Sequence, residues 1–532
     1  LRDDNFTKVL GYRTIGPRAL KVVCSVHLND GNHLRFSSGS GLWRVSAGEI
    51  VYDHLFLGET IDKRRETTGW KDIVYDDSVW EKVNTTDQVQ NTPSGKLTSF
   101  IMPSVQKHEP RIPVEIKRLP KKSGVEFILD FEVNQAMQCT LTFDSDGTDE
   151  GRTLRLHHAE QVDADGDIVI SNDLGGMEDA TTFILGNKRG AQVFETQFAY
   201  FGARFVKISG WPENKPDPDP EIMTCYFVHT SLGGGSSIMF QAAKGSDTAT
   251  ILNGIHDITI RSALSNFMST PTDCPSREKR GWTGDGQTAA ETLIYSFDMA
   301  SSYSKWLGDI VDAQQCNFGA AARSCPANNP FCRVQGDGAN IPEITPFLFD
   351  GVLNGCQIGS DPAWGSGYIA LVDWVYHYYG DAQTLKWHYE AGAAYLDYLL
   401  GFVNTTSSGS FLLDLNYPTT RYGDWCAPLP QGAPTARHTS NLINGFFWLK
   451  QLRIMATAAN RLGFVDDEKK WSEIAERGAQ SYNRLYFSSL EGLYKDIECT
   501  AIGEKRQGPC HNSSATADSE LSKQTAQALP LF

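Results

Sequence analysis

Residues 233–237 read Gly-Gly-Gly-Ser-Ser, and the hydrophobic pattern of the chain changes at this point. Upstream, residues 137–143 alternate apolar and polar side chains, which is the period of two of a half-buried β-strand. Downstream, the apolar residues of 442–462 recur every three or four positions, as they do on one face of a long helix. The glycine–serine run therefore predicts a boundary between a β-rich half and an all-α half.

The prolines at positions 103, 110 and 113 divide the β half into two modules. We expect a β-sandwich domain over residues 1–105, a second one over 106–235, and an all-α domain over 236–532. Further helical periods cover residues 248–268, 287–314, 367–379, 384–403, 465–486 and 518–532. Helices in series that are joined by loops favour hairpins stacked into a bundle or toroid.

The composition excludes several classes of protein. The chain has 532 residues, of which 40% are apolar and 21% charged, so it can bury a large core. No uncharged apolar stretch approaches the roughly 18 residues that a membrane helix needs. With 48 basic and 64 acidic side chains the net charge is −16, which repels nucleic acid and anionic membranes. We therefore expect neither as a partner, and the oligomeric state stays open.

Six of the 11 cysteines gather in two loops: Cys316, Cys325, Cys332 and Cys356 in one, Cys499 and Cys510 in the other. We favour disulfides over a zinc site because the first cluster lacks a C-x-x-C pair and a nearby pair of histidines. Disulfides in turn predict a secreted protein, although no signal-peptide pattern follows Leu1. We expect no cofactor and no metal, with Gly336-Asp337-Gly338 leaving calcium open.

Residues 270–287 read TPTDCPSREKRGWTGDGQ and lie between two helical patterns. The prolines and glycines of this stretch, Gly284 and Gly286 among them, predict an irregular loop throughout. Within it lie three carboxylates, three cations and one indole: Asp273, Glu278, Asp285, Arg277, Lys279, Arg280 and Trp282. Carboxylates accept hydrogen bonds from sugar hydroxyls, and an indole face stacks on a pyranose ring. The composition therefore favours a carbohydrate site over a solvated charged loop.

Glycoside hydrolysis needs one protonated carboxyl group and one ionised one. Repulsion from Asp273 and Asp285 would favour the protonated form of Glu278, whereas the neighbouring cations would oppose it unless they point outwards. We interpret Cys274 as a packed thiol rather than a nucleophile, because no histidine is near it in the sequence.

Two further loops combine an aspartate with a tryptophan just before an expected helix. They are Asp361 with Trp364, and Asp424 with Trp425. In a toroid, both loops and residues 270–287 would gather at one rim and line a pocket. The alternative is that these tryptophans cap the helical core.

The thirteen residues 273–285, DCPSREKRGWTGD, resemble the signature of the α-L-rhamnosidases of glycoside hydrolase family 78. The stretches that support this resemblance, all in family order, are Gly58-Glu59, 130–135, 361–365, 422–425 and QTAQAL at 524–529. The resemblance covers nearly the whole chain. It implies β-sandwich domains followed by an (α/α)6 toroid, and hydrolysis of terminal α-L-rhamnose from glycosides or polysaccharides with inversion of configuration.

The resemblance also implies a role for each motif residue. Glu278 would be the general acid, and Asp273 and Asp285 would bind rhamnose hydroxyls. Trp282, Trp364 and Trp425 would form an apolar wall for the sugar ring; Arg277 and Asp361 complete the expected substrate-binding residues. The alternative is a non-catalytic rhamnose-binding relative of the same fold, since another toroid hydrolase or a lyase would not explain the signature.

Three departures from the family pattern qualify these expectations. The family's general base is a glutamate after the QTAQAL stretch, and the sequence ends first, so we expect a toroid that is incomplete at its C-terminus and lacks the base. Glu132 stands where the family usually has a glycine, so a turn in the second β domain is expected to differ. The cysteine-rich stretch 315–356 resembles an insertion that would reshape the rim of the pocket.

Overall fold

The computed structural model describes residues 20–38, 41–83, 97–119, 124–169, 180–242, 247–316, 340–346, 361–405, 411–413, 422–423, 440–490 and 492–494. The chain divides into two compact units. The first, here called the β unit, comprises Leu1–Phe100, Val105–His229 and Cys274–Lys279. The second, the helical unit, comprises Ile101–Ser104, Thr230–Asp273 and Arg280–Phe532.

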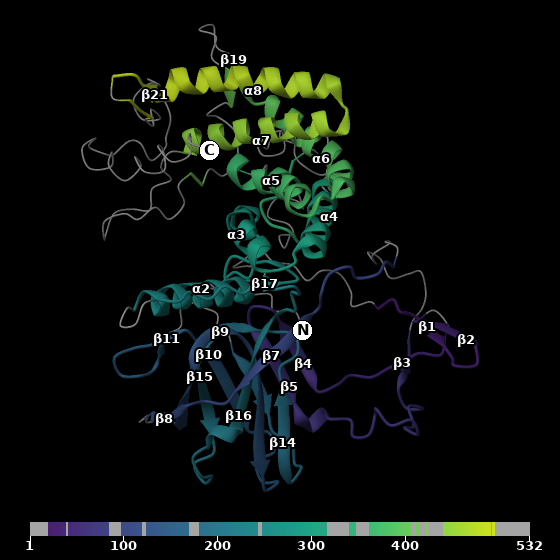
Figure 1. Cartoon of the computed structure of the whole chain (residues 1–532). Coiled ribbons are helices and arrows are strands. Elements are labelled where there is room, and N and C mark those ends of the chain that lie inside the picture. The colour runs from purple at the N-terminus through teal and green to yellow at the C-terminus, as the bar shows by residue number, and fades with distance from the viewer. Residues whose placement is uncertain are drawn as a thin grey trace, which may run out of the picture. The chain divides into compact units, whose positions relative to one another are not determined.

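The β unit is built on a 10-stranded sheet (Figure 1). Its strands are β4 (Ile50–His54), β5 (Gly58–Asp62), β7 (Val105–Arg111), β8 (Glu115–Leu119), β9 (Val125–Ser145), β10 (Thr153–Ala159), β13 (Thr181–Ile184), β14 (Gly190–Glu195), β15 (Phe201–Trp211) and β16 (Met223–Thr230). They are paired in the order β4-β5-β13-β10-β15-β9-β16-β7, and β8 and β14 also pair with β9. Three two-stranded sheets accompany it: β1 (Val23–His27) with β2 (His33–Ser37), β3 (Arg44–Val45) with β6 (Glu81–Lys82), and β11 (Gln161–Val162) with β12 (Ile168–Val169).

The alternation predicted for residues 137–143 is confirmed in β9. Met137, Cys139, Leu141 and Phe143 are at most 1% exposed and belong to one buried apolar cluster of the β unit. Cys139 lies opposite Cys225 of β16, and the two form a disulfide. The chain thus contains a disulfide, as expected, but at a pair of cysteines that the sequence did not single out; the disulfides expected in the two loops stay a prediction. Cys316 is the last residue of a helix, but its side chain is not among the described ones. The other five loop cysteines lie outside the described residues.

Strands β4 and β5 fall within the range expected for a first β domain, yet they extend the same sheet as the later strands. β5 pairs in parallel with β13, with Thr60 opposite Thr182. This pairing requires a glycine at position 58. The φ of Gly58 is +90°, which residues with a side chain rarely adopt, and a Cβ there would lie only 2.9 Å from the carbonyl oxygen of Ala180. β5 and β13 are far apart in the sequence, so no short stretch of residues indicates that they pair.

The helical unit contains seven described helices: α2 (Thr248–Ser265), α3 (Thr283–Ser296), α4 (Ala300–Cys316), α5 (Pro362–Tyr379), α6 (Ala382–Leu400), α7 (Ser440–Leu462) and α8 (Val465–Tyr486). Its short hairpins pair β17 (Phe267–Met268) with β18 (Thr270–Pro271), β19 (Val403–Thr405) with β20 (Phe411–Leu413), and β21 (Phe487–Ser488) with β22 (Leu493–Tyr494). α7 and α8 lie side by side and are joined by a short turn (Figure 1). A β-rich part followed by a helical part is therefore confirmed.

Local signals explain where the helices begin and end. The carboxylate of Asp361 accepts the N–H of Ala363 and caps α5, Pro362 occupies the first turn, and Gly380 ends the helix at a φ of +68°. The range expected as one helix over 287–314 is two helices, α3 and α4. Between them, the N–H of Asp298 bonds to the carbonyl of Gly233, and the N–H of Met299 bonds to the hydroxyl of Tyr379. The helix expected over 518–532 lies outside the described residues.

The expectation of an irregular loop through residues 270–287 is wrong at its C-terminal end. Helix α3 begins at Thr283 and includes Gly284 and Gly286. A Cβ on Gly284 would lie 2.6 Å from the indole of Trp364, and one on Gly286 would collide with Trp306. Close packing of two indoles against the helix therefore explains the glycines, each of which costs a helix about 1 kcal/mol relative to alanine.

Candidate active site

The signature residues are divided between the two units. Asp273 and Arg280 belong to the helical unit and form two hydrogen bonds: the N–H of Asp273 to the carbonyl of Arg280 (3.0 Å), and the N–H of Arg280 to Asp273 Oδ1 (2.9 Å). These bonds close the base of a loop. The six residues inside it, Cys274–Lys279, belong to the β unit and are called the 274–279 segment below.

Glu278 lies in the 274–279 segment with its carboxylate partly open to solvent. The exposed fraction of its side chain is 27%, and Arg277 Nη2 lies 3.0 Å from Glu278 Oε1. The backbone N–H of Glu278 donates to the thiol sulfur of Cys274 at 3.1 Å. Cys274 is half-buried and forms no disulfide, and its sulfur contacts the backbone of the candidate acid.

A cavity of about 960 Å³ lies in the helical unit. It is bordered by side chains of α2, α3, α5 and α7, and Asp273, Asp285 and Trp364 all line it. Three of the residues predicted for substrate binding are therefore brought together around one space. Two carboxylates beside an indole supply hydrogen-bond acceptors for hydroxyls and a flat apolar face for a ring.

Tyr422 connects two of the predicted tryptophans. Its ring lies 5.8 Å from the ring of Trp282, edge to face, and 4.6 Å from the ring of Trp364. Trp282 is further fixed by a β-bridge to Ile344. The third predicted tryptophan, Trp425, lies outside the described residues.

Asp361 is fully buried at the start of α5 and does not line the cavity. In addition to the cap on Ala363, its carboxylate accepts the backbone N–H of Tyr422 at 3.0 Å and the side-chain amide of Asn444 at 3.2 Å. Burial raises the pKa of Asp361 to about 6, because these hydrogen bonds only partly offset the loss of solvation. In this structure Asp361 holds the backbone of Tyr422 in place.

Glu343 is a buried carboxylate that the sequence did not single out. It is 5% exposed, Oε1 accepts the N–H of Asp361 at 2.9 Å, and Oε2 accepts the hydroxyl of Tyr422 at 2.8 Å. Its backbone carbonyl accepts the N–H of Thr283, the first residue of α3, at 2.7 Å. In the sequence, only the position of Glu343 between the apolar residues Ile341 and Ile344 indicates that its carboxylate is buried.

Two general findings concern the residues that the structure describes. Among them, no three His, Cys, Asp or Glu side chains lie close enough to bind a metal ion together. None of the described helices is both long enough and apolar enough to span a membrane.

Three family models match the chain. The bacterial alpha-L-rhamnosidase 6 hairpin glycosidase domain matches residues 244–532, the alpha-L-rhamnosidase N-terminal domain matches 7–109, and the bacterial alpha-L-rhamnosidase concanavalin-like domain matches 120–229.

Curated relatives and solved structures point the same way. An alpha-L-rhamnosidase of Streptomyces avermitilis is 30% identical over 414 residues, which is 76% of this chain and 34% of the relative. One from Formosa agariphila is 26% identical over 89% of this chain and 46% of the relative. The chain thus spans between a third and a half of the length of these relatives.

Among solved structures, the α-L-rhamnosidase from Dictyoglumus thermophilum superposes with a TM-score of 0.71 at 27% identity, over 87% of this chain and 46% of the other. The Streptomyces avermitilis enzyme complexed with L-rhamnose gives 0.69 at 26% identity, over 89% of this chain and 40% of the other. The match of the glycosidase-domain model to more than half of the chain establishes the family. The chain belongs to the bacterial α-L-rhamnosidases.

Proposed function

We propose that this chain belongs to an inverting α-L-rhamnosidase that releases terminal α-L-rhamnose from glycosides or polysaccharides, and that it contains the general acid of the reaction. Family membership and the names of the relatives support this activity. The observation that carries the proposal is the meeting of Asp273, Asp285 and Trp364 around one cavity. A solved relative that is complexed with L-rhamnose supports the choice of sugar.

In the proposed reaction Glu278 is the general acid. Its carboxyl group donates a proton to the glycosidic oxygen while the bond from that oxygen to C1 of rhamnose breaks. A water molecule attacks C1 from the opposite face and loses a proton to a second carboxylate, about 6.5–9.5 Å from the acid. The products are free rhamnose with inverted configuration and the protonated leaving group.

The other predicted residues bind the sugar in this proposal. Asp273 and Asp285 accept hydrogen bonds from rhamnose hydroxyls, and Trp364 packs against the ring. An apolar pocket distinguishes the C5 methyl group of rhamnose from a hydroxymethyl group by only about 1–3 kcal/mol. The hydroxyl contacts of the two aspartates therefore supply much of the selectivity.

Trp282 and Trp425 complete the apolar wall in this proposal. Arg277 is half-exposed and pairs with Glu278; in this proposal its guanidinium group also binds a substrate hydroxyl. For Asp361 we propose an indirect contribution, through the backbone of Tyr422, which lies between Trp282 and Trp364.

We also propose that the protein is secreted. The buried disulfide between Cys139 and Cys225 supports this, because disulfides form and persist in oxidising compartments.

The test is an NMR time course of an aryl α-L-rhamnoside with the protein at its natural full length. The proposal predicts that β-rhamnose appears first and then mutarotates. Appearance of α-rhamnose first would contradict inversion. Binding of rhamnose without release would favour a non-catalytic sugar-binding protein instead.

A further inference from the structure

We infer that Lys279 is a positioning residue for Glu278: its buried ammonium group anchors the 274–279 segment to the β unit and thereby fixes the carboxyl group that donates the proton. The inference rests on the proposed function for the role of Glu278. It gives one residue of the 273–285 signature a structural role: Lys279 binds to the β unit, whereas the signature residues in the proposed function bind the sugar or donate the proton.

The contacts of Lys279 are those of a structural anchor. The residue is 4% exposed, and its Nζ donates to the backbone carbonyls of Leu55 (2.8 Å) and Tyr200. The same nitrogen lies 4.7 Å from the ring centre of Tyr200 and 4.4 Å from that of Phe201. A buried ammonium group is tolerated only where such partners replace its hydration.

The backbone of Lys279 depends on this anchoring. Its φ is +50°, in the left-handed region, which is unfavourable for a residue with a side chain. Because Lys279 follows Glu278 directly, this dihedral sets the path of the chain at the candidate acid. Loss of the side-chain contacts would leave the left-handed conformation without compensation.

A second contact holds the other end of the segment. The N–H of Gly202 donates to the carbonyl of Pro275 at 2.9 Å, and a Cβ on Gly202 would lie 2.6 Å from Pro275 Cγ. Tyr200 and the first two residues of β15 thus contact both Pro275 and Lys279, which flank Glu278 in the sequence.

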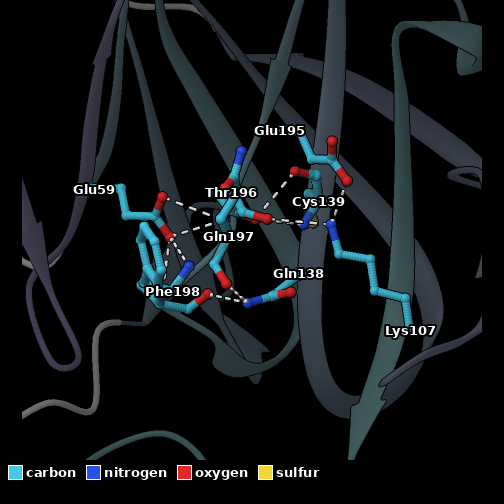
Figure 2. Close-up of polar contacts among 9 residues, drawn as sticks. Glu59, Lys107, Gln138, Cys139, Glu195, Thr196, Gln197 and Phe198 are labelled. Carbon is cyan, nitrogen blue, oxygen red and sulfur yellow. Dashed lines mark hydrogen bonds and ion pairs between the residues drawn. The ribbon is translucent and has the colours of Figure 1, made fainter. Parts of the chain in front are cut away.

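These three residues follow a loop whose backbone is bonded on several sides (Figure 2). The buried carboxylate of Glu59 accepts the N–H groups of Gln197 (3.0 Å), Phe198 (2.6 Å) and Ala199 (2.7 Å). The amide of Gln138 donates to the carbonyls of Gln197 and Ala199. This loop, residues 196–199, therefore gives Tyr200 a fixed position.

His158 lies near the ammonium group of Lys279 but is not positively charged at neutral pH. That ring stacks on Phe201 at 4.3 Å, and burial, together with the positive charges of His157 and Lys279, lowers the pKa of His158 to about 3. At neutral pH it is an uncharged part of the pocket around Lys279.

Misplacement of a general acid has a recognisable kinetic effect. A shift of about 1 Å can cost about 100-fold in rate. The loss depends on the leaving group, because a good leaving group departs without protonation and a poor one does not. A purely structural defect lowers the rate for both kinds of substrate alike.

The test substitutes Lys279→Met in the full-length protein, which keeps an unbranched side chain, one atom shorter, and removes the ammonium group. We expect kcat/KM for phenyl α-L-rhamnoside to fall at least about 30-fold, because this substrate depends on the general acid. For the 2,4-dinitrophenyl substrate we expect a fall of less than about 3-fold, because its leaving group departs without a proton. Affinity for free rhamnose, measured by calorimetry, should stay within 2-fold, since no change is made in the cavity.

Lys207→Met is the matched control, because Lys207 is a buried lysine of the same unit whose Nζ pairs with Glu126 and Asp167. It should change both substrates equally or not at all. If Lys279→Met does not fold, Gly202→Ala displaces Pro275 instead and should give the same dependence on the leaving group. An equal loss on both substrates, or no loss, would overturn the inference, whereas a wild type that releases no rhamnose would overturn the proposed function.

Discussion

Two buried carboxylates, one in each unit, bind the backbone of a distant part of the chain. In the β unit, Glu59 accepts the N–H groups of three consecutive residues of the 196–199 loop. In the helical unit, Asp361 accepts the N–H of Tyr422, 61 positions away, and also caps its own helix. Both residues are 0% exposed.

The two carboxylates differ in what surrounds them. The contacts described for Glu59 are with backbone donors of one loop, whereas Asp361 has the carboxylate of Glu343 bonded to its backbone N–H. Burial raises the pKa of Asp361 to about 6, so the charge of its carboxyl group changes around pH 6. Each unit thus uses a buried acid to hold backbone that is distant in the sequence, and in the helical unit the charge of that acid depends on pH.

The largest effect on stability is expected for Glu59→Gln. The substitution removes the charge and turns an amide donor towards the N–H of Gln197, so the free energy of unfolding should fall by about 2–4 kcal/mol. Urea denaturation measures this. Glu195→Gln is the control, because Glu195 forms an exposed ion pair with Lys107 and should cost less than about 1 kcal/mol. Equal losses for the two variants would contradict the role of Glu59.

The second prediction concerns the pH dependence of Asp361. Its pKa is raised in the folded protein from 3.8 to about 6, so folding favours the protonated form. The stabilising contribution is complete below about pH 3.8 and is lost as the pH rises through 6, by up to about 3 kcal/mol.

The unfolding free energies of wild type and Asp361→Asn, compared between pH 3.5 and 7, test this. The difference between them should shift in favour of the asparagine variant by up to about 3 kcal/mol as the pH rises. A difference that does not change with pH would show that Asp361 ionises at its ordinary pKa.

A smaller effect is expected at the cavity wall. Gly284→Ala would force the indole of Trp364 away from α3, costing about 1–3 kcal/mol of stability and weakening rhamnose binding. Gly308→Ala is the control: it lies within α4, a Cβ there meets nothing within 4 Å, and it should stabilise by about 0.5–1 kcal/mol. Thermal unfolding and calorimetric titration with rhamnose measure both. Unchanged rhamnose binding in Gly284→Ala would remove Trp364 from the sugar site.

The smallest effect is expected for Glu132→Gly. Glu132 lies in β9 with a φ of +68°, the backbone conformation that favours the glycine usual in the family. The substitution should raise the free energy of unfolding by about 0.5–1 kcal/mol, measured by urea denaturation. A loss of stability would mean that the exposed side chain contributes more than the strain costs.

The helices were predictable because their apolar residues repeat every three or four positions. The ranges 442–462 and 465–486 correspond closely to α7 and α8. The helical start at Thr283 was not predictable, because Gly284 and Gly286 are explained by indoles that come from later helices. Likewise, the pairing of β5 with β13 joins segments more than 100 residues apart.

For the candidate site, the sequence indicated the residues that line the cavity and missed much of what holds them. Asp273, Asp285 and Trp364 occur in short motifs whose composition already indicates sugar chemistry. Glu343 has no such motif, since its contacts are with Asp361 and Tyr422, which are distant in the sequence. The anchoring of Lys279 could not be predicted either, because its partners are backbone carbonyls.

The most direct test of the account is the dependence of rate on leaving group in Glu278→Gln, in the protein at its natural full length. We predict a loss of kcat/KM of about 100- to 10,000-fold for phenyl α-L-rhamnoside and a small loss for the 2,4-dinitrophenyl substrate, because only the former needs a proton. Full activity on both substrates, or an equal loss on both, would contradict the assignment of Glu278 as the general acid.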